Sequence, residues 1–208
     1  MTFEIWLLYI ATVLALMSTP GPSQLLMLSN SAAHGFQRSL FTAFGDLTAN
    51  FLQMLAAGFG LAVLLSASAN ALTVIKWLGV VYLLWLGIKM IRKASASDAT
   101  GIAAQKKATR KLLWFQGFFT SAANPKAVVF FAALFPQFID PNSGFAAQFM
   151  ILSVTYIVMD GMFLSAYGAG AAWIVKRFAG TAKKRIEQSG GVFMIGAAVL
   201  LGFRTAGE

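Results

Sequence analysis

The sequence predicts an all-α membrane protein with six transmembrane helices, arranged as two inverted three-helix repeats whose first helices are broken. Three observations lead to this fold: an apolar composition, six long apolar stretches, and a proline break near the start of each half. Apolar residues make up 58% of the 208 residues and charged residues 11%, and the mean hydropathy is +0.72. A soluble domain carries about 25% charged residues. Lipid must therefore cover much of this surface.

Six stretches reach or approach the roughly 20 mostly apolar residues that a transmembrane helix needs. The amino terminus carries Glu4 and no basic segment, so we expect the first stretch to be a retained span and not a cleaved signal peptide. The last is the shortest. The stretches cover about residues 3–31, 40–66, 71–91, 112–139, 145–175 and 189–205.

Basic residues orient these stretches, because thirteen of the sixteen lysines and arginines lie in alternate connections. Cytoplasmic loops carry the excess of Lys and Arg, so both termini are expected outside the cytoplasm. The net charge of +9 then indicates contact with anionic lipid and no nucleic-acid partner. The basic residues of these connections are Arg38, Lys89, Arg92, Lys93, Lys106, Lys107, Arg110, Lys111, Lys176, Arg177, Lys183, Lys184 and Arg185.

A basic, linker-like segment over residues 92–111 divides the chain into two halves, residues 1–91 and 112–208. Its small and polar residues are typical of a flexible cytoplasmic loop. Each half holds three of the apolar stretches. Because three is an odd number, the two halves must cross the membrane in opposite senses.

The first stretch of each half is interrupted by proline. The first interruption is Thr19-Pro20-Gly21-Pro22-Ser23 and the second is Ala123-Asn124-Pro125-Lys126. Proline removes an amide donor and clashes with the carbonyl four residues back. In hydrocarbon the freed groups need protein or a wet cavity. A single proline is often only a kink, but two breaks at matching positions of inverted halves indicate a transporter's central binding site.

The second stretch of each half contains one acid, Asp46 or Asp160. An Asp at the bilayer centre costs about 2.5–3.5 kcal/mol on the insertion scale, so function is the default interpretation of both. Polar residues share a helical face with each acid, where they either line a cavity or form hydrogen bonds between helices. These neighbours are Asn50 and Gln53 around Asp46, and Ser153, Tyr156 and Tyr167 around Asp160.

Lys126 is expected in the first turn of a helix that Asn124 caps and Pro125 begins. A cation is disfavoured there by roughly 0.3–1 kcal/mol, so a negative group should lie nearby. Asp46, Asp160 and a substrate carboxylate are the candidates, and a purely structural Lys–Asp pair is equally open. Half-helix N-termini favour a carboxylate and buried acids favour an ammonium, which an amino acid carries together. The predicted substrate-binding residues are Pro20, Gly21, Pro22, Ser23, Asn50, Asn124, Pro125, Lys126 and Tyr156, with Asp46 and Asp160 for proton coupling.

The motifs Pro20-Gly21-Pro22 and Asn124-Pro125-Lys126 resemble those of the LysE/RhtB family of bacterial amino-acid exporters. The length, the six spans and the basic central loop are also similar, so the resemblance covers the whole chain. In this chain Ser23 follows the first motif, where Asn or Asp is common in the family. The resemblance implies export of amino acids or close derivatives from the cytoplasm through the bacterial inner membrane, driven by an ion gradient. The basic loops place both termini in the periplasm.

Secondary transport by alternating access, with one half rocking against the other, is therefore the predicted function. The sequence has no phosphate-binding Gly-x-x-x-x-Gly-Lys motif, which favours a proton gradient as the driving force. No metal site, cofactor or enzymatic activity is predicted, because the chain has no cysteine and only one histidine, His34. A channel, or a carrier for another small solute or ion, is the alternative. The sequence leaves the oligomeric state open, a homo-oligomer included.

Overall fold

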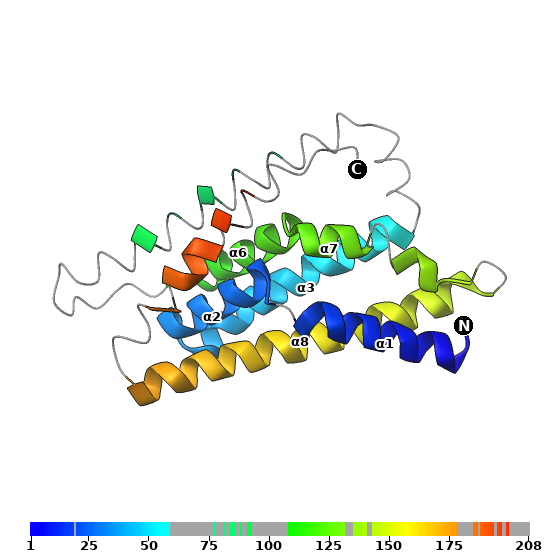
Figure 1. Ribbon diagram of the computed structural model, residues 1–208, viewed down its shortest axis with the longest axis horizontal. Helices are drawn as coiled ribbons and strands as arrows, with labels where there is room; N and C mark the ends of the chain where they lie inside the picture. The colour runs from blue at the N-terminus through cyan, green and yellow to red at the C-terminus, as the bar shows by residue number, and fades with distance from the viewer. Residues whose placement is uncertain are drawn as a thin grey trace.

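The computed structural model describes residues 1–18, 20–58, 108–131, 135–140 and 143–178, and scattered residues beyond them. Every element in these ranges is a helix, which confirms the all-α prediction. Most of the third and sixth predicted spans and of the 92–111 loop lies outside the described residues, so the six spans and the inverted repeat stay predictions. The elements are α1 (Phe3–Ser18), α2 (Pro22–His34), α3 (Phe36–Gly58), α6 (Arg110–Ala122), α7 (Pro125–Val129), the 3₁₀ helix η2 (Phe135–Phe138) and α8 (Phe145–Phe178) (Figure 1).

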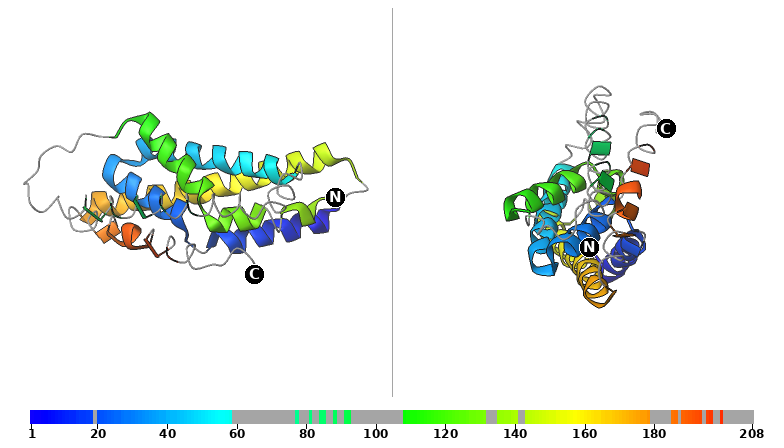
Figure 2. Two further views of the ribbon diagram at one scale, coloured as in Figure 1. Left: turned by 90° about the horizontal axis from the view of Figure 1, so that it is seen from above. Right: turned by 90° about the vertical axis from the view of Figure 1, so that its left-hand side faces the viewer.

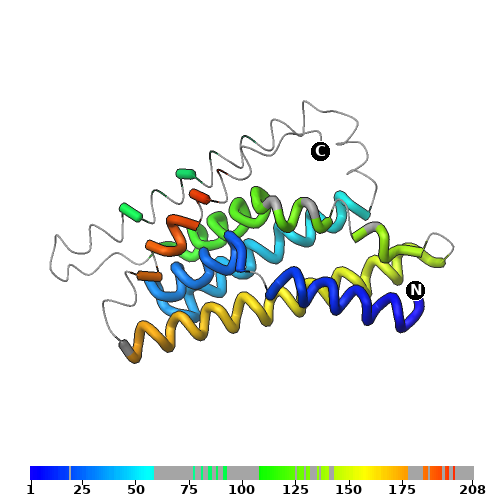
Figure 3. Tube along the Cα trace, viewed as in Figure 1, coloured from blue at the N-terminus to red at the C-terminus, as the bar shows by residue number. Residues whose placement is uncertain are grey.

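Both predicted breaks are present. The first predicted span is a bent pair, α1 and α2, whose axes meet at 57°, and the fourth is interrupted between α6 and α7. Figure 3 shows the first interruption in the chain trace. In the described part of the chain, α8 is the one helix long and apolar enough to cross a membrane alone, and α1 with α2 passes the same test as a pair.

The two broken helices run in opposite directions. The chain turns at Gly35, whose φ of 85° suits glycine, so α2 and α3 form a hairpin. Helix α3 then runs in the same direction as α6, from the Arg38–Ala108 hydrogen bond to the Ser121–Asn50 hydrogen bond. The pair α1–α2 is therefore antiparallel to α6–α7, as inverted halves require.

Helix α8 supports both parts of the first broken helix along its length (Figure 1). At one end Tyr9 of α1 donates a hydrogen bond to the Leu152 carbonyl at 3.2 Å. At the other end Ser31 of α2 donates to the Gly168 carbonyl at 2.5 Å. The two halves of the chain are thus in contact on both sides of the first break.

The closest approach between the halves is the crossing of α3 and α6, which lie side by side in both views of Figure 2. A Cβ atom at Gly45 would overlap the Trp114 carbonyl oxygen, and a Cβ atom at Gly117 would overlap that of Thr42. Small residues allow such backbone contact between membrane helices. Both glycines are therefore required by the packing.

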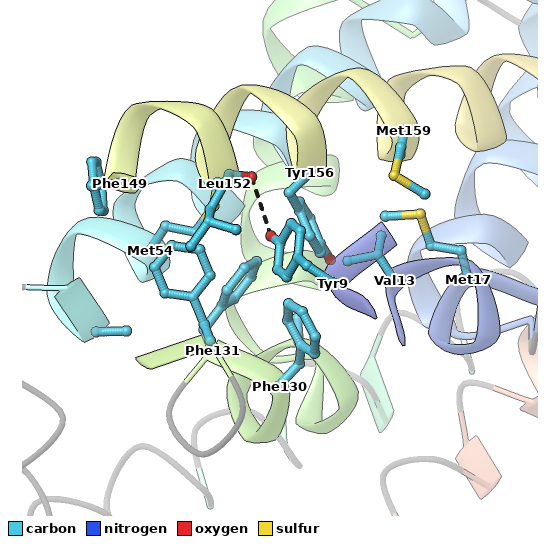
Figure 4. Packing of buried hydrophobic residues seen from close by; sticks show 13 residues of the cluster. Tyr9, Val13, Met17, Met54, Phe130, Phe131, Phe149, Leu152, Tyr156 and Met159 are labelled. Carbon is cyan, nitrogen blue, oxygen red and sulfur yellow. Dashed lines mark hydrogen bonds between the residues drawn. The ribbon is translucent and has the colours of Figure 1, made fainter. Parts of the chain in front are cut away.

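A large aromatic cluster joins α1, the α7–η2 segment and the first half of α8 (Figure 4). Phe131 and Tyr156 lie edge to face with ring centroids 4.8 Å apart, and Tyr9 packs on Phe138 at 5.0 Å. Such pairs contribute about 0.5–1.5 kcal/mol beyond their buried area. The fully buried rings of the cluster are Tyr9, Phe130, Phe131 and Phe135.

The outer faces of α3 and α8 are apolar, with Phe44, Phe51, Val154 and Val158 each at least 40% exposed. Such faces suit lipid and would be unfavourable in water. The start of α3, the start of α6 and the end of α8 lie at the end of the bundle opposite the amino terminus (Figure 1), and each carries described basic residues. That end includes Arg38, Arg110, Lys111, Lys176 and Arg177.

Candidate functional site

The first break is stabilised by Gln24. Helix α1 ends at Ser18, and α2 begins at Pro22, the position where the missing amide of proline costs nothing. The Gly21 amide donates to the Gln24 side-chain oxygen at 2.9 Å, as in a capping box. Pro20 is exposed, whereas Gly21 and Pro22 are buried.

The second break follows the predicted chemistry. Asn124 caps α7, because its Oδ1 accepts a hydrogen bond from the Lys126 amide at 3.1 Å. Gln53 of α3 donates to the Ser121 and Ala122 carbonyls at the end of α6, at 3.3 and 3.4 Å. The Ser121 carbonyl also accepts a hydrogen bond from the Asn124 amide at 3.0 Å. The Gln53 side chain therefore adds hydrogen bonds at the end of α6, where the helix itself supplies few.

The two breaks face each other. Asn124 of the second donates a hydrogen bond to the Ser23 hydroxyl of the first at 3.4 Å. The Lys126 side chain lies next to Gly21, with its Cδ atom 3.7 Å from the position that a Cβ atom on Gly21 would occupy. Segments about one hundred residues apart in sequence therefore form one site.

The two predicted acids are bridged by Asn50. Its Nδ2 donates to Asp46 at 2.9 Å and to Asp160 at 2.8 Å, and its Oδ1 accepts from the Ser121 hydroxyl at 2.8 Å. The Asp46 and Asp160 side chains are 2% and 3% exposed. One amide thus ties α3, α6 and α8 together at the carboxyl pair.

Lys126 provides the positive charge of the site. Lys126 lines the same cavity as Asp46 and Asp160, the two acids predicted to compensate it. Asp46 keeps one oxygen, Oδ1, without a hydrogen bond among the described residues, although the Ser23 and Ser121 hydroxyls lie close to this carboxyl group. The site therefore combines two acids, one cation and a carboxylate oxygen whose hydrogen-bonding capacity is not fully used.

These groups surround a small cavity at the breaks. Its volume is about 20 Å³, room for about one water molecule. Its lining includes seven of the predicted site residues; Pro20, Gly21 and Pro22 shape the break behind it without lining it, and Pro125 begins α7. The seven are Ser23, Asp46, Asn50, Asn124, Lys126, Tyr156 and Asp160.

Five lining residues were not predicted: Leu16, Met17, Gln24, Ser121 and Ala127. Gln24 carries a sequence signal, since it stands three residues after Gly21, the N-cap of α2, as in a capping box. Ser121 is a polar residue one turn before Asn124 within an apolar span. The three apolar residues carry no signal that separates them from other core positions.

The chain matches the family model described as LysE type translocator over residues 14–205. It is 35% identical over 208 residues to the homoserine/homoserine lactone efflux protein of Salmonella typhimurium, covering 99% of this chain and 100% of that protein. It is 29% identical to the leucine efflux protein of Klebsiella pneumoniae, covering 78% of this chain and 81% of that one. An uncharacterized membrane protein of Vibrio cholerae is 33% identical, over 83% of each chain. No solved structure matches the chain significantly.

The match extends across both halves and includes both breaks and both acids of the cavity. Translocators move a solute across the membrane without changing its bonds, so this chain is not an enzyme. The predicted resemblance is confirmed: the chain belongs to the LysE family of membrane translocators.

Proposed function

We propose that this protein exports amino acids or close derivatives from the cytoplasm through the bacterial inner membrane, with both termini in the periplasm. Two of its relatives are named for efflux of homoserine, its lactone, or leucine. The gathering of Arg38, Arg110 and Lys176 at the end of the bundle opposite the amino terminus supports the orientation, since cytoplasmic ends carry the Lys and Arg excess.

The observation that carries this proposal is the cavity in which both helix breaks and both acids meet. Discontinuous helices and ionisable residues at such a point are features of secondary transporters. The cavity offers acidic groups for an ammonium and Lys126 for a carboxylate, and an amino acid carries both.

Transport would occur by alternating access, with the two halves rocking about this cavity. At about 20 Å³ the cavity is too small for an amino acid, so opening requires helices to separate. The aromatic cluster, which includes Tyr9 and Phe131, closes the amino-terminal side. Release to the periplasm would require this cluster to part.

Proton entry would drive the export, with Asp46 or Asp160 as the carrier. Moving one charge through 100 mV yields about 2.3 kcal/mol. At 1.36 kcal/mol per tenfold, this energy sustains a gradient of roughly 50-fold. One proton per zwitterionic amino acid would therefore suffice.

Efflux from proteoliposomes tests the proposal. Vesicles are loaded with a mixture of labelled amino acids, and loss is measured with and without an imposed proton gradient. Gradient-dependent loss of one class is expected, and saturable counterflow should separate this carrier from a channel, the alternative function. If vesicles that contain folded protein lose no amino acid, the amino-acid assignment is wrong.

A further inference from the structure

We infer that the cavity recognises the two charged groups of a neutral α-amino acid separately, with the ammonium at the Asp46–Asp160 pair and the carboxylate at Lys126. The side chain would then lie against Leu16, Met17 and Ala127. This inference rests on the proposed function and adds the orientation of the substrate and its class.

The ammonium end is defined by the hydrogen bonds of the two acids. Asn50 occupies one oxygen of each carboxyl group, at 2.9 and 2.8 Å, and Asp46 Oδ1 makes no hydrogen bond within the described ranges. An ammonium has three donors. It satisfies this buried oxygen and reaches the Asp160 carboxyl across the same cavity.

The carboxylate end is Lys126, the one cation among the described residues that line the cavity. It lines the cavity together with Asp160, and its four-carbon stem lets the charge move. A zwitterion that enters between the two groups gives Asp160 a new cation and Lys126 a new anion. The substrate thus adds a cation beside the two acids and an anion beside Lys126, and the net charge of the cavity stays as it was before binding.

The remaining wall determines which side chains fit. Leu16 and Met17 of α1 and Ala127 of α7 are apolar and line the cavity. A charged substrate side chain placed against them would lose its hydration without a new partner, which is strongly unfavourable. An uncharged side chain loses little, and Met17 can adjust to its shape.

This arrangement makes the proton and the substrate compete. The charged and titratable groups facing the cavity are Asp46 on α3, Asp160 and Tyr156 on α8, and Lys126 on α7. A proton on either acid removes a negative charge that would hold the ammonium. Substrate and proton then occupy the pair in turn, as exchange of one for the other requires.

Homoserine and homoserine lactone separate the two ends, because the lactone keeps the ammonium but has no carboxylate. In proteoliposomes, each unlabelled compound is titrated against counterflow of labelled homoserine or labelled lactone. The wild-type protein should bind homoserine more tightly. Lys126→Met should lower the apparent affinity for homoserine by about tenfold or more, and should change the apparent affinity for the lactone by no more than about twofold. Lys126→Arg should restore the preference for homoserine.

Lys176→Met is the matched control, since Lys176 is exposed in the last turn of α8, and it should match the wild type. Size-exclusion profiles of all variants establish folding. If Lys126→Met lowers the apparent affinities for homoserine and for the lactone by the same factor, the assignment of the carboxylate to Lys126 is wrong. Lysine and leucine are titrated as further unlabelled competitors, and inhibition by lysine as strong as that by leucine would overturn the neutral side-chain class. A wild-type protein that moves none of these compounds would refute the proposed function itself.

Discussion

Asp46 and Asp160, which belong to opposite halves of the chain, accept hydrogen bonds from the same side-chain nitrogen of Asn50 at 2.9 and 2.8 Å. Neither carboxyl group can change its charge without affecting the other. One amide therefore connects the two carboxyl groups and, through them, α3 and α8.

Asp46→Asn and Asp160→Asn should each strongly weaken the response of transport to a proton gradient. Either change removes a charged hydrogen-bond partner of the site, for which we expect about a 10- to 100-fold loss of gradient-driven efflux. Efflux is measured at matched protein content with and without the gradient. Glu4→Gln, a change at an exposed acid of α1, is the control and should behave as the wild type. If both Asn variants keep full proton-driven efflux, neither acid carries the proton.

Asn50→Leu should destabilise the fold as well as the site. The change leaves the Ser121 hydroxyl without its acceptor and both carboxyl groups without their shared donor. A buried polar group without a partner costs about 1–3 kcal/mol. Thermal unfolding in detergent measures the loss. Thr48→Val on the same helix removes only a hydrogen bond to Phe44 on the exposed face and should change stability by less than about 0.5 kcal/mol. Equal midpoints for the two variants would contradict a structural role of Asn50.

Gly45→Ala and Gly117→Ala should each force α3 and α6 apart, because the added methyl group meets a backbone carbonyl that no rotamer change can move. Overpacking of this kind costs about 1–3 kcal/mol or more. Gly170→Ala in α8 has open space around the new methyl group and should be neutral or slightly stabilising, since alanine favours helix. Melting temperatures in detergent distinguish these outcomes, and tolerance of alanine at both crossing positions would mean that the helices are less closely packed.

Two substitutions at Asn124 separate its two contacts. Asn124→Ala removes the cap of α7 and the hydrogen bond to Ser23, and a lost cap costs about 0.5–2 kcal/mol. Asn124→Asp keeps an acceptor for the Lys126 amide but cannot donate to Ser23. We expect Asn124→Asp to keep most of the stability that the cap contributes and Asn124→Ala to lose this contribution, as measured by thermal unfolding. A loss of stability as large in the Asp variant would assign the effect to the contact between the breaks.

Local chemistry explains what the sequence predicted well. Pro22 and Pro125 set where α2 and α7 begin, and Asn124 caps the second of these helices, all within a few residues of chain. Helical periodicity likewise placed Asn50 on the face of Asp46. These features need no knowledge of the rest of the fold.

The sequence did not predict which helix faces contact each other when the helices are far apart along the chain. Nothing near Asn50 indicates that its second partner is Asp160, 110 positions away. Gly45 and Gly117 look like any other small residues of a membrane helix, and only the crossing distinguishes them. In the sequence, Leu16 and Met17 cannot be told from other core residues, and only the structure places them at the cavity.

The glycine crossing lies beside the charged end of the cavity, since Gly45 precedes Asp46 and Gly117 stands one turn before Ser121. A hinge moves least at its axis. If the halves pivot where their backbones touch, the carboxyl pair keeps nearly constant geometry while α1 and α7 sweep through the larger displacement. We therefore expect strict discrimination at the ammonium of the solute and wide tolerance of side-chain bulk, so that one transporter would serve several amino acids of unequal size.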